Sequence, residues 1–151
     1  MISDLIKLTG ELHIVLRDQY GNIKDERVVP NLVVTTGKYL LARRLAGVVT
    51  GTSATPSHMG VGSSSVAADV SNTSVTALGS RVALNTITDP GLTNVVTMSA
   101  TFIAGVGTGA ITEAGIFNAL TGGVMLCRTV FATVNKAAGD VLTINWAITI
   151  N

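Results

Sequence analysis

Apolar and polar side chains alternate most regularly near the C-terminal end of the chain, over residues 142–150. A repeat of two is the period of a β-strand that buries one face and exposes the other. A second alternation runs through residues 12–16, followed by turn-forming residues at 18–22 and a more polar run at 23–29. This order predicts an early hairpin and a late core strand. The apolar side chains of that late strand are Leu142, Ile144, Trp146, Ile148 and Ile150.

A helical pattern is found at residues 36–46. Thr36 is the expected N-cap and Gly47 the expected stop, because these residue types favour helix ends. Arg43 and Arg44 fall in the last turn, where positive charge complements the helix dipole. The apolar stripe of this helix is expected to consist of Tyr39, Leu40, Leu41 and Leu45.

Short strands separated by glycine-rich turns are predicted for the rest of the chain. They are expected at residues 58–62, 81–84, 95–103, 111–118 and 124–131, with a long loop at 62–74. The pattern predicts an all-β, mainly antiparallel fold, a β-sandwich of jelly-roll or Ig-like type with one short helix. A single domain is expected over residues 11–151, preceded by an N-terminal arm at residues 1–10.

Charge is scarce beyond the first third of the sequence. Only seven of the 107 residues after Arg44 carry a formal charge, and the net charge of the whole chain is +1. A free monomer usually carries more charge than this to resist self-association. No apolar run approaches the roughly 20 residues that span a bilayer. We therefore expect a subunit that is buried against other subunits, with neither nucleic acid nor membrane as its main partner.

Residues suited to catalysis or cofactor binding are isolated from one another along the sequence. Gly37 and Lys38 follow an apolar run, as in a phosphate-binding loop, but Leu32 occupies the place of that motif's first glycine. Cys127 is expected to be a buried packing residue rather than a reactive thiol or zinc ligand. His13 and His58 have no neighbouring partner in the sequence. We expect no enzyme activity, no cofactor, no metal site and no small-molecule substrate.

Two charged residues lie on strands that are expected to pair. Glu113 and Arg128 belong to the predicted hairpin around Gly122 and Gly123. They are expected to form either an ion pair within the chain or a contact between subunits. Trp146 shares the apolar face of the last strand, which favours a core position over an exposed platform for sugar.

Several longer motifs of the chain resemble those of a known group of proteins. They are ITEAGIFNA at 111–119, MLCRTVF at 125–131, LTINWAITI at 142–150 and NLVVTTGK at 31–38. The chain resembles small virion proteins of tailed bacteriophages, and most of all their capsid decoration, or cement, proteins. Related modules also occur in phage tail and fibre proteins.

The resemblance implies a structural role on the outer surface of the phage head. The chain would bind the outer face of the major capsid protein lattice, stabilise the head and form a homotrimer. The resemblance carries no catalytic residues with it. The candidate interface residues are Ile2, Leu5, Ile6 and Leu8 of the predicted arm, together with Glu113 and Arg128.

Alternatives to this hypothesis remain at the level of sequence. The chain could be a tail- or fibre-associated host-recognition module whose loop at residues 51–74 contacts sugar on the host cell. It could also be an internal tail or neck component. The arm at residues 1–10 could equally be a frayed terminus.

Overall fold

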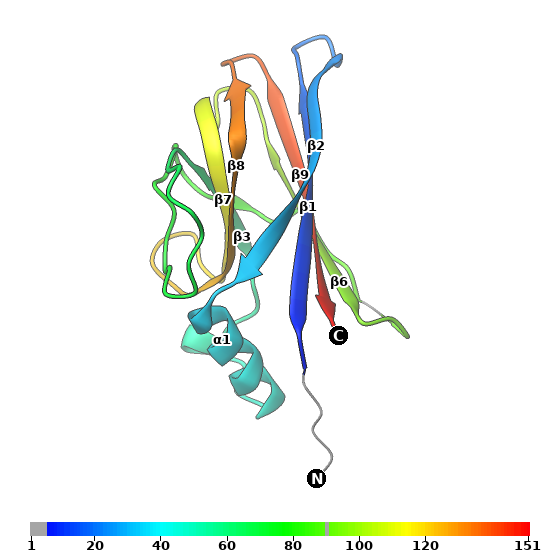
Figure 1. The fold of residues 1–151 in the computed structure, drawn as a ribbon, viewed down its shortest axis with the longest axis vertical. Helices are drawn as coiled ribbons and strands as arrows, with labels where there is room; N and C mark the ends of the chain where they lie inside the picture. The colour runs from blue at the N-terminus through cyan, green and yellow to red at the C-terminus, as the bar shows by residue number, and fades with distance from the viewer. Residues whose placement is uncertain (1–5, 90) are drawn as a thin grey trace.

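The computed structural model describes residues 6–89 and 91–151, and within these ranges nine strands form one antiparallel sheet (Figure 1). One α-helix, α1 (Thr35–Leu45), and a short 3-10 helix, η1 (Gly51–Ser53), complete the described structure. The strand order is β4-β3-β7-β8-β2-β1-β9-β6-β5. The strands are β1 (Leu8–Arg17), β2 (Ile23–Val33), β3 (His58–Gly62), β4 (Val82–Ala83), β5 (Thr86–Ile87), β6 (Val95–Phe102), β7 (Gly109–Phe117), β8 (Met125–Lys136) and β9 (Val141–Ile150).

The sheet curls over so that its two halves face each other as two layers. One layer holds β3, β7 and β8, and the other holds β2, β1, β9 and β6 (Figure 1). Strand β2 joins them, since it pairs with β1 along most of its length and with β8 only at Leu32 and Val33. The predicted all-β, mainly antiparallel class with one helix is confirmed. A jelly-roll or Ig-like type is not confirmed, because the strands form one continuous curled sheet.

The core lies between the two layers and follows the predicted alternation. Leu142, Ile144 and Trp146 of β9 are fully buried, and Trp146 has Leu12 of β1 and Met98 of β6 as its cross-strand partners. Side chains at alternate positions bury one face of each strand and leave the other toward solvent. The core position predicted for Trp146 is confirmed.

The first strand begins earlier than the sequence predicts. Leu8 pairs with Ile150 of β9, and the backbones of Lys7 and Asn151 exchange two hydrogen bonds of 2.8 and 2.7 Å. Residues 8–10 therefore belong to the sheet, so β1 begins within the stretch predicted as an arm, residues 1–10, and before residue 11, the predicted start of the domain. Ile2 and Leu5 of the predicted arm lie outside the described residues.

The helix differs from its prediction at its start and on its surface. Val34 occupies the N-cap position, and Thr36 lies inside the helix, where its hydroxyl donates a 2.8 Å hydrogen bond to the carbonyl oxygen of Met125. The predicted stop at Gly47 is confirmed, with φ at +82°. Of the predicted apolar stripe, only Leu40 is fully covered, and Leu45 is 91% exposed. Within the described ranges, no helix is long and apolar enough to cross a membrane.

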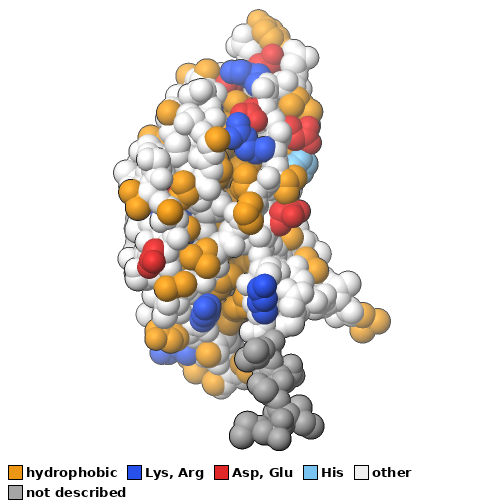
Figure 2. Space-filling view, viewed as in Figure 1, with side chains coloured by type: hydrophobic (Ala, Val, Ile, Leu, Met, Phe, Trp, Pro, Cys, Tyr) orange, Lys and Arg blue, Asp and Glu red, His pale blue; other side chains and the backbone are white. Residues whose placement is uncertain are grey.

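Charge is distributed unevenly over the molecule. Figure 2 shows charged side chains gathered along the β1–β2 hairpin. On the same face of the molecule, the layer that contains β7 and β8 shows mostly hydrophobic and uncharged polar side chains. This agrees with the sequence, in which twelve of the nineteen charged residues fall within residues 1–46. Much of the surface therefore lacks the charges that keep free proteins apart.

Candidate functional site

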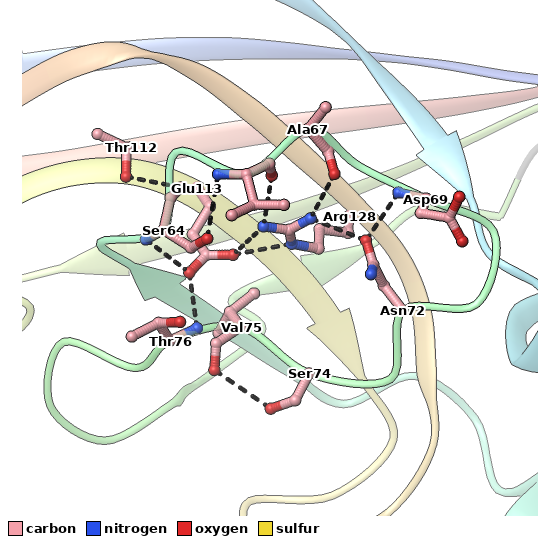
Figure 3. A network of polar contacts seen from close by, with 11 residues as sticks. Ser64, Ala67, Asp69, Asn72, Ser74, Val75, Thr76, Thr112, Glu113 and Arg128 are labelled. Atoms are coloured by element: carbon pink, nitrogen blue, oxygen red, sulfur yellow. Dashed lines mark hydrogen bonds and ion pairs between the residues drawn. The ribbon is translucent and has the colours of Figure 1, made fainter.

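A buried ion pair joins two adjacent strands of one layer, β7 and β8 (Figure 3). Glu113 lies on β7 and Arg128 on β8, and the guanidinium nitrogens Nε and Nη2 of Arg128 each lie 2.8 Å from Oε2 of Glu113. The Arg128 side chain is 4% exposed and the Glu113 side chain 0%. A buried charge is costly unless its remaining donors and acceptors are also satisfied.

The long loop after β3 supplies those remaining partners. The other carboxylate oxygen of Glu113 accepts hydrogen bonds from the backbone N–H groups of Ser64, at 3.0 Å, and Thr76, at 2.6 Å. Arg128 donates to the carbonyl oxygen of Val66, at 3.1 Å, and to the side-chain oxygen of Asn72, at 2.8 Å. The ion pair thus anchors both ends and the middle of this loop, residues 63–76, in one conformation.

The loop shows its outer side to solvent. Ser63, Ser65, Val66 and Thr73 are exposed. The long loop predicted at residues 62–74 is confirmed from Ser63 onward, whereas Gly62 is still the last residue of β3. A serine- and threonine-rich surface is therefore held on a rigid internal anchor.

The ion pair decides between the two alternatives that the sequence leaves open for Glu113 and Arg128. Their contact lies within one chain, and their burial leaves almost no side-chain surface for a partner. The ion-pair alternative is confirmed. Neither residue is available as a direct contact between subunits.

A first apolar groove lies between α1 and the inner face of β9, and we call it the α1–β9 groove. Its volume is about 200 Å³, and Arg44 is the one charged residue among the described residues that line it. Ile87 and Ile150 stand at its open side, 45% and 44% exposed. Its apolar walls include Leu40, Leu41, Met98, Leu126 and Ile148.

A second groove lies between α1 and the start of β1, and we call it the α1–β1 groove. Its volume is about 520 Å³, and Ile6 and Leu8 are among its lining residues. Lys7 and Lys38 supply the charged groups of its lining within the described residues. The structure thus brings Ile6 and Leu8, both predicted interface residues, to one hydrophobic surface beside the helix.

The helix-bearing end of the molecule carries further exposed apolar side chains. Tyr39 and Leu45 of α1 are 64% and 91% exposed, and Ile6 is 74% exposed. Large apolar groups clustered at one end are typical of a surface that another molecule covers. The sequence predicts these residues as the apolar stripe of the helix, but it does not show that Tyr39 and Leu45 lie exposed. The sequence does not reveal the grooves, because the first requires α1, β5, β6 and β9 to meet and the second requires α1, β1 and β2 to meet.

The remaining titratable residues do not converge on either groove. His13 contacts Glu26 at 2.8 Å on the β1–β2 hairpin, and His58 contacts the hydroxyl of Ser57 at 2.8 Å. Cys127 is fully buried, and burial raises the pKa of its thiol, as expected for a packing residue. Among residues 6–89 and 91–151, no group of three or more His, Cys, Asp or Glu side chains could hold a metal ion.

A second buried charge lies where β8 turns into β9. Lys136 is 2% exposed and donates a 3.0 Å hydrogen bond to the carbonyl oxygen of Ile103, and burial lowers the pKa of its ammonium group. Asp140 accepts a 2.6 Å hydrogen bond from Lys24, which lowers the pKa of the Asp140 carboxyl. Sequence reasoning did not place Lys136 inside, although it shares the alternation of Val134 on β8.

Comparison of the chain with protein-family models, with curated proteins and with solved structures finds no match. The resemblance to phage virion proteins rests on the sequence motifs alone.

Proposed function

We propose that this chain is a structural protein of a tailed-bacteriophage virion, a decoration protein that binds the outer face of the major capsid protein lattice. Three features support the proposal: the resemblance of the sequence motifs to those of phage virion proteins, the scarcity of charge after Arg44, and the apolar grooves beside α1. The proposal includes a homotrimer as the form that sits on the capsid.

The observation that carries the proposal is the helix-bearing end. There, the described surface combines two grooves with exposed Tyr39, Leu45 and Ile150. Specific protein interfaces bury about 1,600 Å² in total and have an apolar centre with a more polar rim. Aromatic and aliphatic groups at the centre, with Lys38 and Arg44 beside them, match that composition.

The mechanism would be multivalent stabilisation of the shell. Each copy would cover apolar surface on neighbouring capsid subunits and resist their separation under internal DNA pressure. A modest binding free energy per contact adds up to a large stabilisation of the shell when many contacts must break together. The chain needs no catalytic group for this role.

The proposal is tested by adding the purified protein to phage capsids that have been stripped of it. We expect saturable binding at many copies per capsid and a higher temperature of capsid rupture. A double variant, Tyr39→Gln with Leu45→Gln, should bind more weakly while remaining folded, because both side chains are exposed. The matched control is Tyr20→Gln, which changes an 80% exposed residue in the β1–β2 turn at the opposite end (Figure 1). Absence of binding to stripped capsids would reject the proposal.

A second candidate function, host recognition from the tail, is favoured by one observation. The Glu113–Arg128 pair holds the exposed loop at residues 63–76 in one conformation, which would lower the entropic cost of binding a ligand there. Binding of the isolated protein to host cells or to glycans would favour this function. Binding to capsids without binding to cells would count against it.

A further inference from the structure

We propose that the α1–β1 groove binds an extended acidic segment of a partner protein, which adds a strand beside the first residues of β1. The inference rests on the proposed function only for the source of this segment, which would be the capsid lattice. The mode of binding follows from the groove itself.

The groove opens where two paired strands separate. Gly10 and Asn31 form the last pair between β1 and β2. β1 nevertheless begins at Leu8, and β2 runs on to Val33. Beyond the last pair, β1 stays beside β9, while β2 crosses to β8 (Figure 1). The groove lies between the separated ends, since Leu8 and Val33 are both among its lining residues.

The backbone of β1 directs hydrogen-bonding groups toward this opening. Lys7 faces β9, because it exchanges backbone hydrogen bonds of 2.8 and 2.7 Å with Asn151. Successive residues of a strand direct their N–H and C=O groups to opposite sides. The N–H and C=O groups of Leu8 therefore point away from β9, on the side that β2 has left, and no residue of β2 is paired with Leu8. A strand edge of this kind is a template for an added strand.

The charges around the groove favour an acidic segment. Lys7 and Lys38 are both exposed, and the described lining of the groove contains no acidic residue. Among the described residues, neither lysine takes part in an ion pair. Lys38 also lies near the N-terminal end of α1, where a positive charge is unfavourable because that end of the helix dipole is already positive. A partner with carboxylates would compensate both lysines.

The two faces of β1 predict the pattern of the segment. Side chains alternate between the faces of a strand, so Leu8 and Lys7 lie on opposite faces, and Leu8 packs against the core. A strand added beside β1 would place apolar residues next to Leu8 and acidic residues next to Lys7. We therefore expect apolar and acidic residues to alternate along the segment. Pairing with the backbone of β1 requires a polypeptide, which favours a protein partner over anionic lipid or nucleic acid.

The mode of binding is tested on the isolated protein with synthetic peptides. The probe is acetyl-EVEVEV-amide, and acetyl-KVKVKV-amide, with the same length and apolar content, is its control. We expect the acidic peptide to shift the amide NMR resonances of Leu8 and Val33 saturably, and the basic peptide to leave them unchanged.

Substitution of the lysines gives a second readout of the same binding. Lys7→Glu and Lys38→Glu should each weaken binding of the acidic peptide by about fivefold, the upper range for an exposed ion pair. Both side chains are exposed, so both variants should fold. Arg17→Glu makes the same change of charge at an exposed position at the other end of β1 and should leave the affinity nearly unchanged.

Binding to stripped capsids then tests the source of the segment. We expect the double variant, Lys7→Glu with Lys38→Glu, to bind capsids more weakly than Arg17→Glu does. If the wild type does not bind capsids but the acidic peptide binds the groove, the proposed function fails and the groove serves another acidic partner. If the wild type binds capsids and the lysine variants bind as tightly as Arg17→Glu, the inference is overturned and the proposed function stands.

Three further results would overturn the inference. The first is the absence of a saturable shift at Leu8 with the acidic peptide, or an equal shift with the basic one. The second is binding of the wild type to phosphatidylserine-containing vesicles without binding of the peptide, which would assign the lysines to a membrane surface. The third is a wild-type dimer by light scattering that Lys7→Glu separates, which would assign the groove to a second copy.

Discussion

At the scale of single residues, the Glu113–Arg128 pair shapes the loop more than any other described contact. Both charged groups are shielded from water, and their spare hydrogen-bonding atoms are used by Ser64, Val66 and Thr76. Buried ion pairs seldom add much net stability over an apolar pair, but removing one partner leaves a buried charge without compensation. The pair is therefore expected to fix the conformation of the loop at residues 63–76.

Replacing Arg128 by Met should destabilise the protein by about 3–5 kcal/mol, because Glu113 would remain buried without its partner. Urea unfolding measures the change, and limited proteolysis should show earlier cleavage within residues 63–76. Arg17→Met, at an exposed position on β1, is the control and should stay within about 0.5 kcal/mol of the wild type. An Arg128→Met protein as stable as this control would contradict the role assigned to the pair.

Asp140 should make the stability of the fold depend on pH. The hydrogen bond from Lys24 lowers the pKa of the Asp140 carboxyl below the usual 3.8. Ionisation of this carboxyl therefore stabilises the folded state relative to the unfolded state. This contribution is present above pH 4 or so and is lost as the pH falls through the folded-state pKa.

The expected result for Asp140→Asn is lower stability than the wild type at pH 7, with the difference closing as the pH is lowered toward about 2. Thermal unfolding at a series of pH values measures it. Glu11→Gln removes a carboxylate from an exposed position and serves as the control. A difference between wild type and Asp140→Asn that did not change with pH would rule out the carboxylate as its source.

At the scale of elements, the contact of α1 with β8 depends on a glycine. A Cβ atom added to Gly37 would lie 1.9 Å from the carbonyl oxygen of Leu126. Only a residue without a side chain allows the helix to approach the strand this closely. This approach places Leu40 and Leu41 at one wall of the α1–β9 groove.

Gly37→Ala should therefore destabilise the protein by about 1–3 kcal/mol through overpacking, although Ala favours an isolated helix by about 1 kcal/mol. Chemical denaturation measures the balance. The matched control is Gly139→Ala, whose added Cβ would meet nothing closer than 3.5 Å, and it should be nearly neutral. A stabilised Gly37→Ala protein would mean that the helix does not pack as closely as described.

The elements also show how far the sequence could predict this structure. Strands with a regular alternation were predicted well, since the repeat itself encodes which face is buried, as in β9 and β6. The start of α1 was not, because Thr36 uses its hydroxyl for Met125 across the fold rather than for a cap. The two-residue strand β5 is too short to leave a pattern.

For the candidate site, the sequence predicted residues but not their arrangement. Glu113 and Arg128 could be selected as isolated charges in an apolar region. Their hydrogen bonds to the loop at residues 63–76 depend on how that loop folds back. The grooves likewise arise where distant segments meet, and no local pattern signals such a meeting.

At the scale of the whole molecule, the curled sheet, the scarcity of charge after Arg44 and the apolar end favour a protein that functions within an assembly.

In the proposed function, the chain is a many-copy component of a phage head. The most direct measurement is the number of copies per purified virion, by quantitative mass spectrometry, together with antibody-gold labelling of intact particles. We expect several copies for every capsomer and label spread over the head. A few copies labelled at the tail, or no copies in the particle, would contradict it.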